Sequence, residues 1–457
     1  MNPRFSRRDL LRHSLVGASA LGLSRLSLGA ENNDAKGQRA QVGSLDTDQP
    51  LPETERIRWW RDAGLGLFMH WGLSSVRGDY DLSWGMMHGI PGAVPPDEYW
   101  RDIANFKPEH LNIDRMLSAA SKAGFRYAVF TTRHCEGYAM WPSKFGELGV
   151  RTSLPGKDFV REFVEGCRRH NLKVGLYYFP SDWWTLRHVM SFRVFSEKQR
   201  DPTLPDLDTA WKPVVLPPES SPQHQQAWRE ANAISRGQIL ELLQNYGLID
   251  VMWFDGTPAV VTQDEVRALQ PNILINPRMH GTGDFATPEH DFPRERPSGP
   301  WELCTVWGAY WGYDKNQSLR STDSVLRQLA DIRGWGGNLL LNIGPNAGGD
   351  FPPKAYERLA ELESWMRWAE PAVRGVQGGP WPEKSNRPIT VKGRVWYGWF
   401  DPWKEDGLVL SDVDKPKSVT FLKDGTPMPF SYDGRKLTIP RAPWVGPPLC
   451  DIARIEF

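Results

Sequence analysis

The sequence predicts an α/β fold, a β/α barrel or a doubly wound sheet, followed by a small antiparallel β-sandwich. Short apolar runs alternate with helical patterns between about residues 55 and 375, as they do in both α/β architectures. After residue 375 the strands become short and are separated by turn pairs such as Asp424-Gly425 and Asp433-Gly434. That spacing is typical of a β-sandwich.

The apolar runs and periodic patterns place the elements in order along the chain. We expect strands at 65–72, 127–132, 173–179, 251–254, 273–278, 301–307 and 338–343. Helices are expected at 97–105, 111–123, 157–170, 227–246, 322–333 and 352–367. Residues 184–225 are rich in proline and polar residues and are interpreted as an insertion. Later strands are expected at 389–400, 407–410, 418–422, 436–440 and 451–457.

Composition excludes one class of function. The chain has 457 residues, 40% of them hydrophobic, which is enough for a large core and two or three domains. Its formal net charge of +0 argues against a nucleic-acid binder, because nothing supplies the electrostatic attraction to phosphate. The 22 tryptophans are an excess that core packing mostly explains, although aromatic faces also stack on sugar rings.

The N-terminus has the pattern of an export signal. Paired arginines, Arg7-Arg8, precede a modest apolar stretch and a small-residue site ending at Ala30, which indicates a twin-arginine signal over 1–30. A flexible lead-in is expected over 31–50, then a barrel over 51–374 and a sandwich over 375–457. The predicted location is periplasmic or secreted. Arg25 interrupts the apolar stretch, so we expect no membrane span.

The four cysteines give no framework for a metal or a disulfide. Cys135, Cys167, Cys304 and Cys450 are widely spaced; an oxidising compartment permits disulfides, but the spacing assigns no pair among them. No His-x-x-x-His or Cys-x-x-Cys spacing supports a zinc site, so no metal and no cofactor are predicted. A metal-dependent hydrolase remains an alternative on residue type alone.

Polar side chains stand at the ends of several predicted strands: His70, His134, Tyr178, Asp255 and Arg278. In a barrel these ends converge on one face, so residues distant in sequence share a pocket. Asp255 is the most informative, because it follows the buried run Val251–Phe254 directly. The structural alternative is that the Asp255 side chain only caps the following loop or helix.

Retaining hydrolysis of a glycoside needs two carboxyl groups about 5 Å apart, a nucleophile and an acid/base. Asp255 is the candidate nucleophile. Two partners lie downstream: Glu289, in a loop rich in glycine, proline and charge, and Glu302, at a strand start. A structural role is expected for Glu302, and Glu289 is the predicted acid/base.

Taken together, these segments resemble the retaining α-L-fucosidase family of glycoside hydrolases. The resemblance covers about residues 55–375 and rests on segments in the family's order. They are Phe68-Met69-His70-Trp71-Gly72, Arg133-His134, Trp141-Pro142-Ser143-Lys144, Gly175-Leu176-Tyr177-Tyr178, Asp182-Trp183, Glu241-Leu242-Leu243, Asn245-Tyr246-Gly247, Trp253-Phe254-Asp255-Gly256 and Gly336-Gly337-Asn338-Leu339-Leu340-Leu341-Asn342-Ile343-Gly344-Pro345.

The resemblance implies a (β/α)8-like TIM barrel with a C-terminal β-sandwich, and hydrolysis of terminal α-L-fucose from oligo- or polysaccharides. It implies Asp255 as nucleophile and Glu289 as acid/base. The substrate-binding residues it implies are His70, Trp84, His134, Tyr178 (or a tyrosine next to it), Trp253 and Arg278.

Three departures from the family's pattern concern the sugar. Cys135 and Glu136 stand in a stretch where the family usually has His and Asp, and Ser83 precedes Trp84 where a glutamate is common. The insertion 184–225 is longer than expected. Two alternatives therefore stay open: a glycosidase acting on another sugar of similar stereochemistry, or a weakly catalytic carbohydrate-binding protein.

Overall fold

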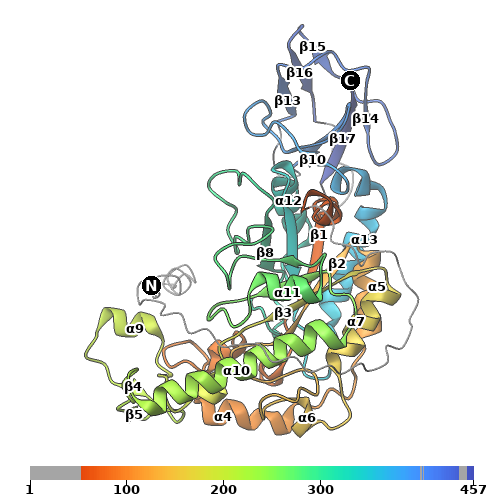
Figure 1. Ribbon diagram of the computed structural model, residues 1–457. Coiled ribbons are helices and arrows are strands. Elements are labelled where there is room, and N and C mark those ends of the chain that lie inside the picture. Colours follow the sequence, from red (N-terminus) through yellow and green to blue (C-terminus); the bar gives the residue numbers. More distant parts are fainter. Residues whose placement is uncertain (1–52, 402–403, 405, 442–449) are drawn as a thin grey trace.

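The centre of the molecule is a curled sheet of seven parallel strands (Figure 1). The computed structural model describes residues 53–401, 404, 406–441 and 450–457. The strands are β1 (Leu65–Met69), β2 (Tyr127–Arg133), β3 (Lys173–Tyr178), β6 (Val251–Phe254), β7 (Leu274–Ile275), β8 (Glu302–Val306) and β9 (Asn338–Asn342). Their order is β7-β6-β3-β2-β1-β9-β8, and every pair is parallel. The sheet is barrel-like, in line with the sequence prediction.

The segment 284–290 lies between the two edge strands. At β7, the Asp284 N–H donates to the Ile275 carbonyl at 2.8 Å. At β8, the His290 N–H donates to the Cys304 carbonyl at 2.9 Å, and Glu289 forms a parallel β-bridge with Cys304. The segment therefore joins β7 to β8 by backbone hydrogen bonds, which the sequence did not predict because it lacks a strand-like apolar pattern.

Alternate residues of the strands face opposite sides of the sheet, as the two-residue period of a strand requires. A compact cluster fills the inside of the curl: Phe68, Tyr127, Val129, Tyr177, Val251, Trp253, Leu274, Phe285, Cys304 and Leu340. The larger cluster packs between the outer face and the helices, and it includes Met69, Phe130, Leu176, Tyr178, Met252 and Phe254. This parity decides which strand-end side chains meet on the inside.

Ile57, Trp60 and Ala63 belong to the inner cluster, whereas the helices of this part mostly cover the outer face of the sheet (Figure 1). They are α2 (Glu53–Arg56), α3 (Arg58–Ala63), α4 (Pro96–Arg101), α5 (Ile113–Lys122), α6 (Val150–Ser153), α7 (Phe159–Arg169), α10 (Pro222–Asn245), α11 (Gln263–Leu269), α12 (Thr322–Gly334) and α13 (Pro353–Val373). Short 3-10 turns are η1 (Leu73–Val76), η2 (Leu82–Met86) and η3 (Asp102–Asn105).

All the predicted helices of this part are present, with two longer than predicted. α10 begins at Pro222, where Ser221 caps it, and α13 continues to Val373. Helix α11 was not predicted, although Thr262 and Glu265 form a capping box at its start. The predicted insertion 184–225 contains all but the first residue of α8 (Trp183–Leu186), together with α9 (Phe195–Arg200) and a separate two-stranded sheet of β4 (Asp206–Leu207) and β5 (Pro213–Val214).

Two antiparallel sheets follow α13. One has the order β10-β11-β12-β17-β14, formed by β10 (Gln377–Gly378), β11 (Ile389–Lys392), β12 (Val395–Phe400), β17 (Asp451–Glu456) and β14 (Ser418–Phe421). The other is β13-β16-β15, formed by β13 (Leu408–Ser411), β16 (Lys436–Ile439) and β15 (Ser431–Tyr432). A shared core, with Ile389, Leu408, Leu437 and Ile455, joins the sheets.

One strand prediction in this region was wrong. Residues 389–400 form a hairpin instead of one strand, because Gly393 takes φ +58° and turns the chain between β11 and β12. The two parts of the molecule are in contact: Thr390 Oγ1 donates to the Ala372 carbonyl at 2.8 Å. The predicted boundary near residue 375 stays a prediction.

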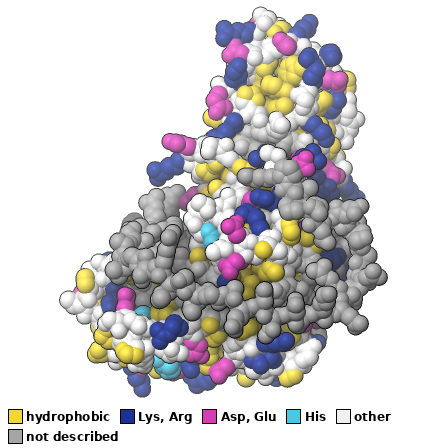
Figure 2. Space-filling model, in the orientation of Figure 1, with side chains coloured by type: hydrophobic (Ala, Val, Ile, Leu, Met, Phe, Trp, Pro, Cys, Tyr) yellow, Lys and Arg dark blue, Asp and Glu magenta, His cyan; other side chains and the backbone are white. Residues whose placement is uncertain are grey.

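The described surface in Figure 2 mixes the two signs of charge, with Lys and Arg interspersed among Asp and Glu, as the net charge of +0 leads one to expect. None of the helices in the described residues is both long and apolar enough to cross a membrane. The predicted export signal 1–30 and lead-in 31–50 lie outside the described residues.

Candidate active site

The polar strand-end residues meet at the carboxyl edge of the sheet. His70 follows β1 and Asp255 follows β6, each two residues beyond an inward side chain, Phe68 and Trp253. Both therefore continue the inner face of the curl. Carboxyl ends of barrel strands are where enzymes of this architecture place their chemistry.

Asp255 is held at two points by its neighbours. Tyr177 donates its hydroxyl hydrogen to Oδ2 at 2.8 Å, and Arg278 Nη1 lies 3.2 Å from Oδ1. The chain turns away at once after Asp255: Gly256 has φ +75°, and a Cβ there would lie 2.9 Å from the Phe179 ring. The turn leaves the carboxylate half-buried, with 26% of its side chain exposed.

Arg278 joins two carboxylates. Its Nη2 lies 2.8 Å from Glu289 Oε2, while Nη1 holds Asp255. The guanidinium carbon of Arg278 lies 4.5 Å from the centre of the Trp253 ring, and this cation–π contact helps to orient the guanidinium. Nε donates to Thr287 Oγ1 at 3.1 Å. Asp255 and Glu289 thus occupy the two terminal nitrogens of the guanidinium.

Glu289 and Glu302 were the two candidates for an acid/base, and the structure separates them. Glu302 is fully buried at the start of β8, where it accepts hydrogen bonds from the Tyr127 hydroxyl and from Trp253 Nε1. Burial raises the pKa of its carboxyl to about 7. Glu302 lies in the layer beneath Trp253, so only Glu289 reaches the arginine beside Asp255.

His70 is a neutral, oriented imidazole. Burial is the main cause that lowers its pKa to about 3, and the nearby His134 lowers it further. Asn342, the last residue of β9, accepts at Oδ1 from His70 Nδ1 at 2.8 Å and from the His70 backbone N–H at 3.3 Å. The ring centre of Trp311 lies 5.1 Å from that of His70.

His134 lies beside His70, with ring centres 6.5 Å apart. Its ring is within 10° of parallel to Tyr177, with centres at 5.9 Å. Nδ1 is 2.6 Å from Ser83 Oγ, which in turn is hydrogen-bonded to Glu136 Oε2. Burial lowers the pKa of His134 to about 3, so this imidazole is also neutral.

The two predicted tryptophans lie in different places: Trp253 contacts Arg278, which binds Asp255 and Glu289, and Trp84 lies in η2. Trp253 is directly under Arg278. Trp84 belongs to η2, next to Ser83, and packs edge-on against Trp183 with ring centres at 5.5 Å. Trp84 is partly buried at this contact with Trp183.

Tyr178 is not brought together with the other predicted residues. Its side chain points to the outer face of the sheet, where the hydroxyl is bonded to Arg133 at 2.6 Å and Gln238 at 2.8 Å. Tyr177, one residue earlier, has the opposite parity and contacts Asp255. The resemblance implied a tyrosine at position 178 or next to it, and Tyr177 is the one that lies beside Asp255.

Two further residues at the site were missed from the sequence. Asn342 is the last residue of β9, a position similar to those of His70 and Asp255 at the ends of β1 and β6. Looking for polar residues at the end of every predicted strand could therefore have found it. Trp311, whose ring centre is also 5.1 Å from that of His290, lies in a loop after β8 that gives no periodic signal.

Cys135, Cys167, Cys304 and Cys450 are free and buried in the structure. Cys304 lies under the site, with Sγ 3.4 Å from Arg278 Nη2. Among the described residues, no three His, Cys, Asp or Glu side chains are arranged to hold a metal ion. The described polar groups of the site bind one another directly.

Two carboxylates side by side at the carboxyl edge of a curled parallel sheet, with neutral histidines and aromatic rings around them, define the class: a glycoside hydrolase site. The comparisons with known proteins agree. The family model described as Alpha-L-fucosidase matches residues 30–370. The chain belongs to the α-L-fucosidase family.

Individual relatives cover most of the chain at low identity. The tissue alpha-L-fucosidase of Rattus norvegicus is 26% identical over 411 residues, which is 82% of each protein, and that of Homo sapiens is 26% identical over 83% of this chain and 81% of its own. Among solved structures, alpha-L-fucosidase isoenzyme 1 from Paenibacillus thiaminolyticus has a TM-score of 0.73 at 25% identity, covering 88% of this chain and 99% of its own.

Proposed function

We propose that this protein is a retaining exo-glycosidase that removes terminal α-L-fucose from oligo- or polysaccharides. The observation that carries the proposal is the arrangement of Asp255 and Glu289 on the two terminal nitrogens of Arg278, at 3.2 Å and 2.8 Å. Carboxylates on adjacent nitrogens of one guanidinium are closely spaced, and a separation of about 5 Å is what retention requires.

In the first step Asp255 Oδ attacks the anomeric carbon as Glu289 protonates the leaving glycosidic oxygen, and the glycosidic bond breaks. In the second step Glu289 removes a proton from water, whose oxygen attacks the anomeric carbon and releases Asp255. The Tyr177 hydrogen bond and Arg278 keep the Asp255 carboxylate oriented for the attack.

The remaining residues fit the binding of a small deoxy sugar. His70 and His134 are neutral imidazoles that offer one hydrogen-bonding nitrogen each to hydroxyl groups, since their Nδ1 atoms are already engaged by Asn342 and Ser83. Trp311, 5.1 Å from His70 between ring centres, offers an aromatic face for the apolar side of the sugar.

The test is hydrolysis of an aryl α-L-fucoside by the mature protein and by Asp255→Ala. We expect turnover by the wild type and a loss of roughly a thousandfold or more in the variant, because the covalent route is closed. Azide added to the variant occupies the space left by the carboxylate, displaces the aryl alcohol and restores turnover with formation of the β-fucosyl azide. Full activity of Asp255→Ala without azide sinks the assignment.

A second candidate is hydrolysis of a different sugar of similar stereochemistry. Cys135 is fully buried, and Ser83 Oγ is already bonded to His134 and Glu136, so neither supplies the family's usual contact. Hydrogen bonds missing at a sugar hydroxyl change preference by about 1–3 kcal/mol. A panel of aryl glycosides decides: a higher kcat/KM for a sugar other than fucose favours this candidate.

We also propose that the protein is exported to the periplasm or beyond through the twin-arginine route. Arg7-Arg8 and the apolar stretch after them support it, and the family match begins at residue 30, the last residue of the expected signal. Changing both arginines to lysine should retain the protein in the cytoplasm with its signal uncleaved. Unchanged export of that variant excludes the route.

A further inference from the structure

Glu136, Ser83 and His134 form a continuous hydrogen-bonded chain at the edge of the candidate sugar site. Glu136 Oε2 is bonded to Ser83 Oγ, and Ser83 Oγ lies 2.6 Å from His134 Nδ1. The backbone N–H of Glu136 also donates to Ser83 Oγ, at 3.1 Å. Exposed fractions are 5%, 0% and 6% respectively, so bulk water does not compete for these bonds.

The hydroxyl of Ser83 can complete this chain in two ways. A serine hydroxyl has one hydrogen to donate and two lone pairs that accept. The backbone N–H of Glu136 takes one lone pair, which leaves one hydrogen and one lone pair for two partners, the Glu136 carboxyl and His134 Nδ1. The direction of one bond therefore fixes the direction of the other.

With Glu136 ionised, the carboxylate only accepts, so Ser83 donates to it and His134 Nδ1 must carry the hydrogen that Ser83 accepts. His134 Nε2 then holds a lone pair. With Glu136 protonated, the carboxyl donates to Ser83, Ser83 donates to Nδ1, and the hydrogen of the neutral imidazole moves to Nε2. Ser83 keeps its bonds to Glu136 and to His134 Nδ1 in both arrangements.

His70 lacks this freedom. Asn342 Nδ2 donates to the Trp311 carbonyl at 2.7 Å, which assigns the amide oxygen to the His70 side. That oxygen only accepts, so His70 Nδ1 carries the hydrogen and Nε2 holds the lone pair in all conditions where the ring is neutral. The two neighbouring histidines thus differ: one is fixed and the other depends on Glu136.

We propose that Glu136 acts through Ser83 as a positioning residue that sets whether His134 Nε2 accepts or donates a hydrogen bond toward the substrate. No hydrogen bond of Nε2 to another residue occurs in the part of the chain that the structure describes, and the ring lies beside His70 and Tyr177. The direction toward a sugar hydroxyl rests on the proposed function, whereas the change of tautomer does not.

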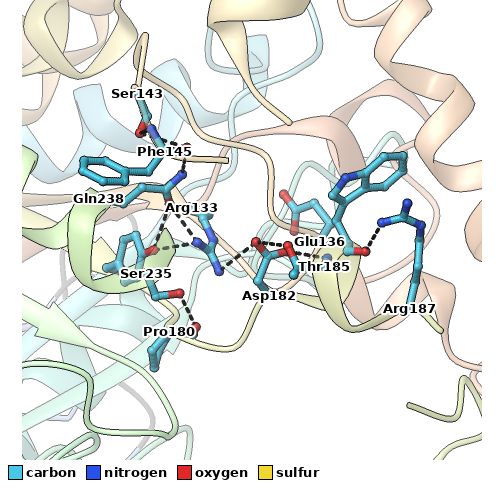
Figure 3. Close-up of polar contacts among 12 residues, drawn as sticks. Arg133, Glu136, Ser143, Phe145, Pro180, Asp182, Thr185, Arg187, Ser235 and Gln238 are labelled. Carbon is cyan, nitrogen blue, oxygen red and sulfur yellow. Dashed lines mark hydrogen bonds and ion pairs between the residues drawn. The ribbon is translucent and has the colours of Figure 1, made fainter. Parts of the chain in front are cut away.

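The surroundings of Glu136 allow both states near neutral pH. Burial raises its pKa to about 7, against the hydrogen bond from Ser83 and its own backbone amide, which lower it. Two charged groups face it from neighbouring elements. Arg133, at the end of β2, lowers the pKa, and Asp182, after β3, raises it; their side chains are 3.8 Å apart and largely oppose each other (Figure 3).

The other titratable groups that face Glu136 are Tyr80, Tyr99, Cys135 and His134 itself. Burial raises the pKa of the two tyrosines and of the thiol, so all three are neutral in the physiological range. His134 is neutral because burial lowers its pKa to about 3. Glu136 is therefore the group of this cluster that changes charge near neutral pH.

The decisive measurement is the ¹⁵N spectrum of the imidazole rings in the ligand-free wild type labelled at its ten histidines. From pH 9 to pH 5 we expect His134 Nε2 to move from a lone-pair nitrogen to an N–H nitrogen, with Nδ1 moving the opposite way. His70 is the internal control, with Nδ1–H throughout. A His134 tautomer that stays constant over this range overturns the proposal.

Two variants test whether Glu136 controls the His134 tautomer through Ser83. Glu136→Gln removes the titration, so the His134 tautomer should no longer change with pH. Glu136→Asp keeps a carboxyl but withdraws it by one methylene from Ser83, so it should uncouple the tautomer in the same way. Retention of the wild-type transition in either variant excludes the route through Ser83. A thermal melt confirms that each variant is folded.

Activity provides the link to the substrate. If the sugar assignment holds, the inflection in kcat/KM that tracks the His134 transition disappears in Glu136→Gln, with KM changing more than kcat. The spectrum needs no substrate, so a wild type that does not hydrolyse the fucoside refutes the proposed function and leaves the spectroscopic result to decide the inference by itself.

Discussion

Tyr177 donates a 2.8 Å hydrogen bond to Asp255, while the next residue of the same strand, Tyr178, bonds to the buried Arg133 on the opposite face of the sheet. The two neighbouring tyrosines thus serve different purposes: one orients a carboxylate in the candidate site, and the other satisfies a buried cation beneath the helices. This pair provides a matched test.

Tyr177→Phe should lower kcat/KM roughly 10- to 100-fold, because a hydrogen bond to a charged group contributes about 1.5–3 kcal/mol. Tyr178→Phe should leave kcat/KM nearly unchanged and lower the free energy of unfolding by about 1–3 kcal/mol, since Arg133 loses a partner while fully buried. Steady-state kinetics and urea unfolding of both variants are the measurements. Equal kinetic losses in the two variants contradict the assignment of Tyr177.

Glu289→Gln should slow hydrolysis of a natural fucosylated glycan by about 10²–10⁴-fold, the usual contribution of a general acid. Aryl fucosides with an acidic leaving group need no protonation, so their first step should be slowed far less. The measurement is a plot of log kcat/KM against the pKa of the leaving group, and the slope of this plot should be steeper in the variant. Glu302→Gln is the control: the same slope as wild type is expected, and a steeper one there identifies Glu302 as the acid instead.

Arg278→Lys should reduce kcat/KM at least tenfold, because a point charge replaces the planar fork that holds Asp255 and Glu289 on separate nitrogens. The variant keeps the charge, so the loss reports geometry. Arg236→Lys is the matched control, as Arg236 pairs with Glu265 at 2.6 Å away from the site. Activity of Arg278→Lys equal to that of the control contradicts a role for the fork.

Glu302→Gln should change how stability depends on pH. Burial raises the pKa of Glu302 from 4.5 to about 7, so the folded protein binds its proton more tightly than the unfolded chain. This contribution is fully present below pH 4.5 and is lost as pH rises through 7, by up to about 3 kcal/mol.

The glutamine is uncharged and can donate to Tyr127 while accepting from Trp253, so that loss is absent in the variant. Urea unfolding of both proteins at pH 5 and pH 8 checks it. The variant should gain stability relative to wild type at the higher pH. The contribution of Glu136, also buried, cancels in the difference; an equal difference at both pH values contradicts the prediction.

Much of the site follows from the sequence, because buried parallel strands are continuous apolar runs whose ends are visible. Asp255 is found from the run Val251–Phe254 and the turn after it. The run at β3 is apolar on both faces, so it does not reveal which of Tyr177 and Tyr178 points inward. That one-residue ambiguity explains why the resemblance implied Tyr178 or a tyrosine next to it, whereas Tyr177 is the one that lies beside Asp255.

Contacts between distant segments were beyond sequence reasoning. Ser83 and Glu136 are 53 positions apart, and only the fold shows that a serine which seems to remove a polar contact is part of a buried chain. The segment 284–290 is ordered by backbone hydrogen bonds to Ile275 and Cys304, which are distant in the sequence. Its own residues therefore show no strand-like periodicity that could have predicted it.

That segment does two jobs with the same residues. It connects the edge strands and carries Glu289 opposite Cys304. Exchanging this stretch between family members would therefore replace both the proposed acid/base, Glu289, and the backbone link between β7 and β8, so specificity could not be transferred there without also changing how the sheet is held together.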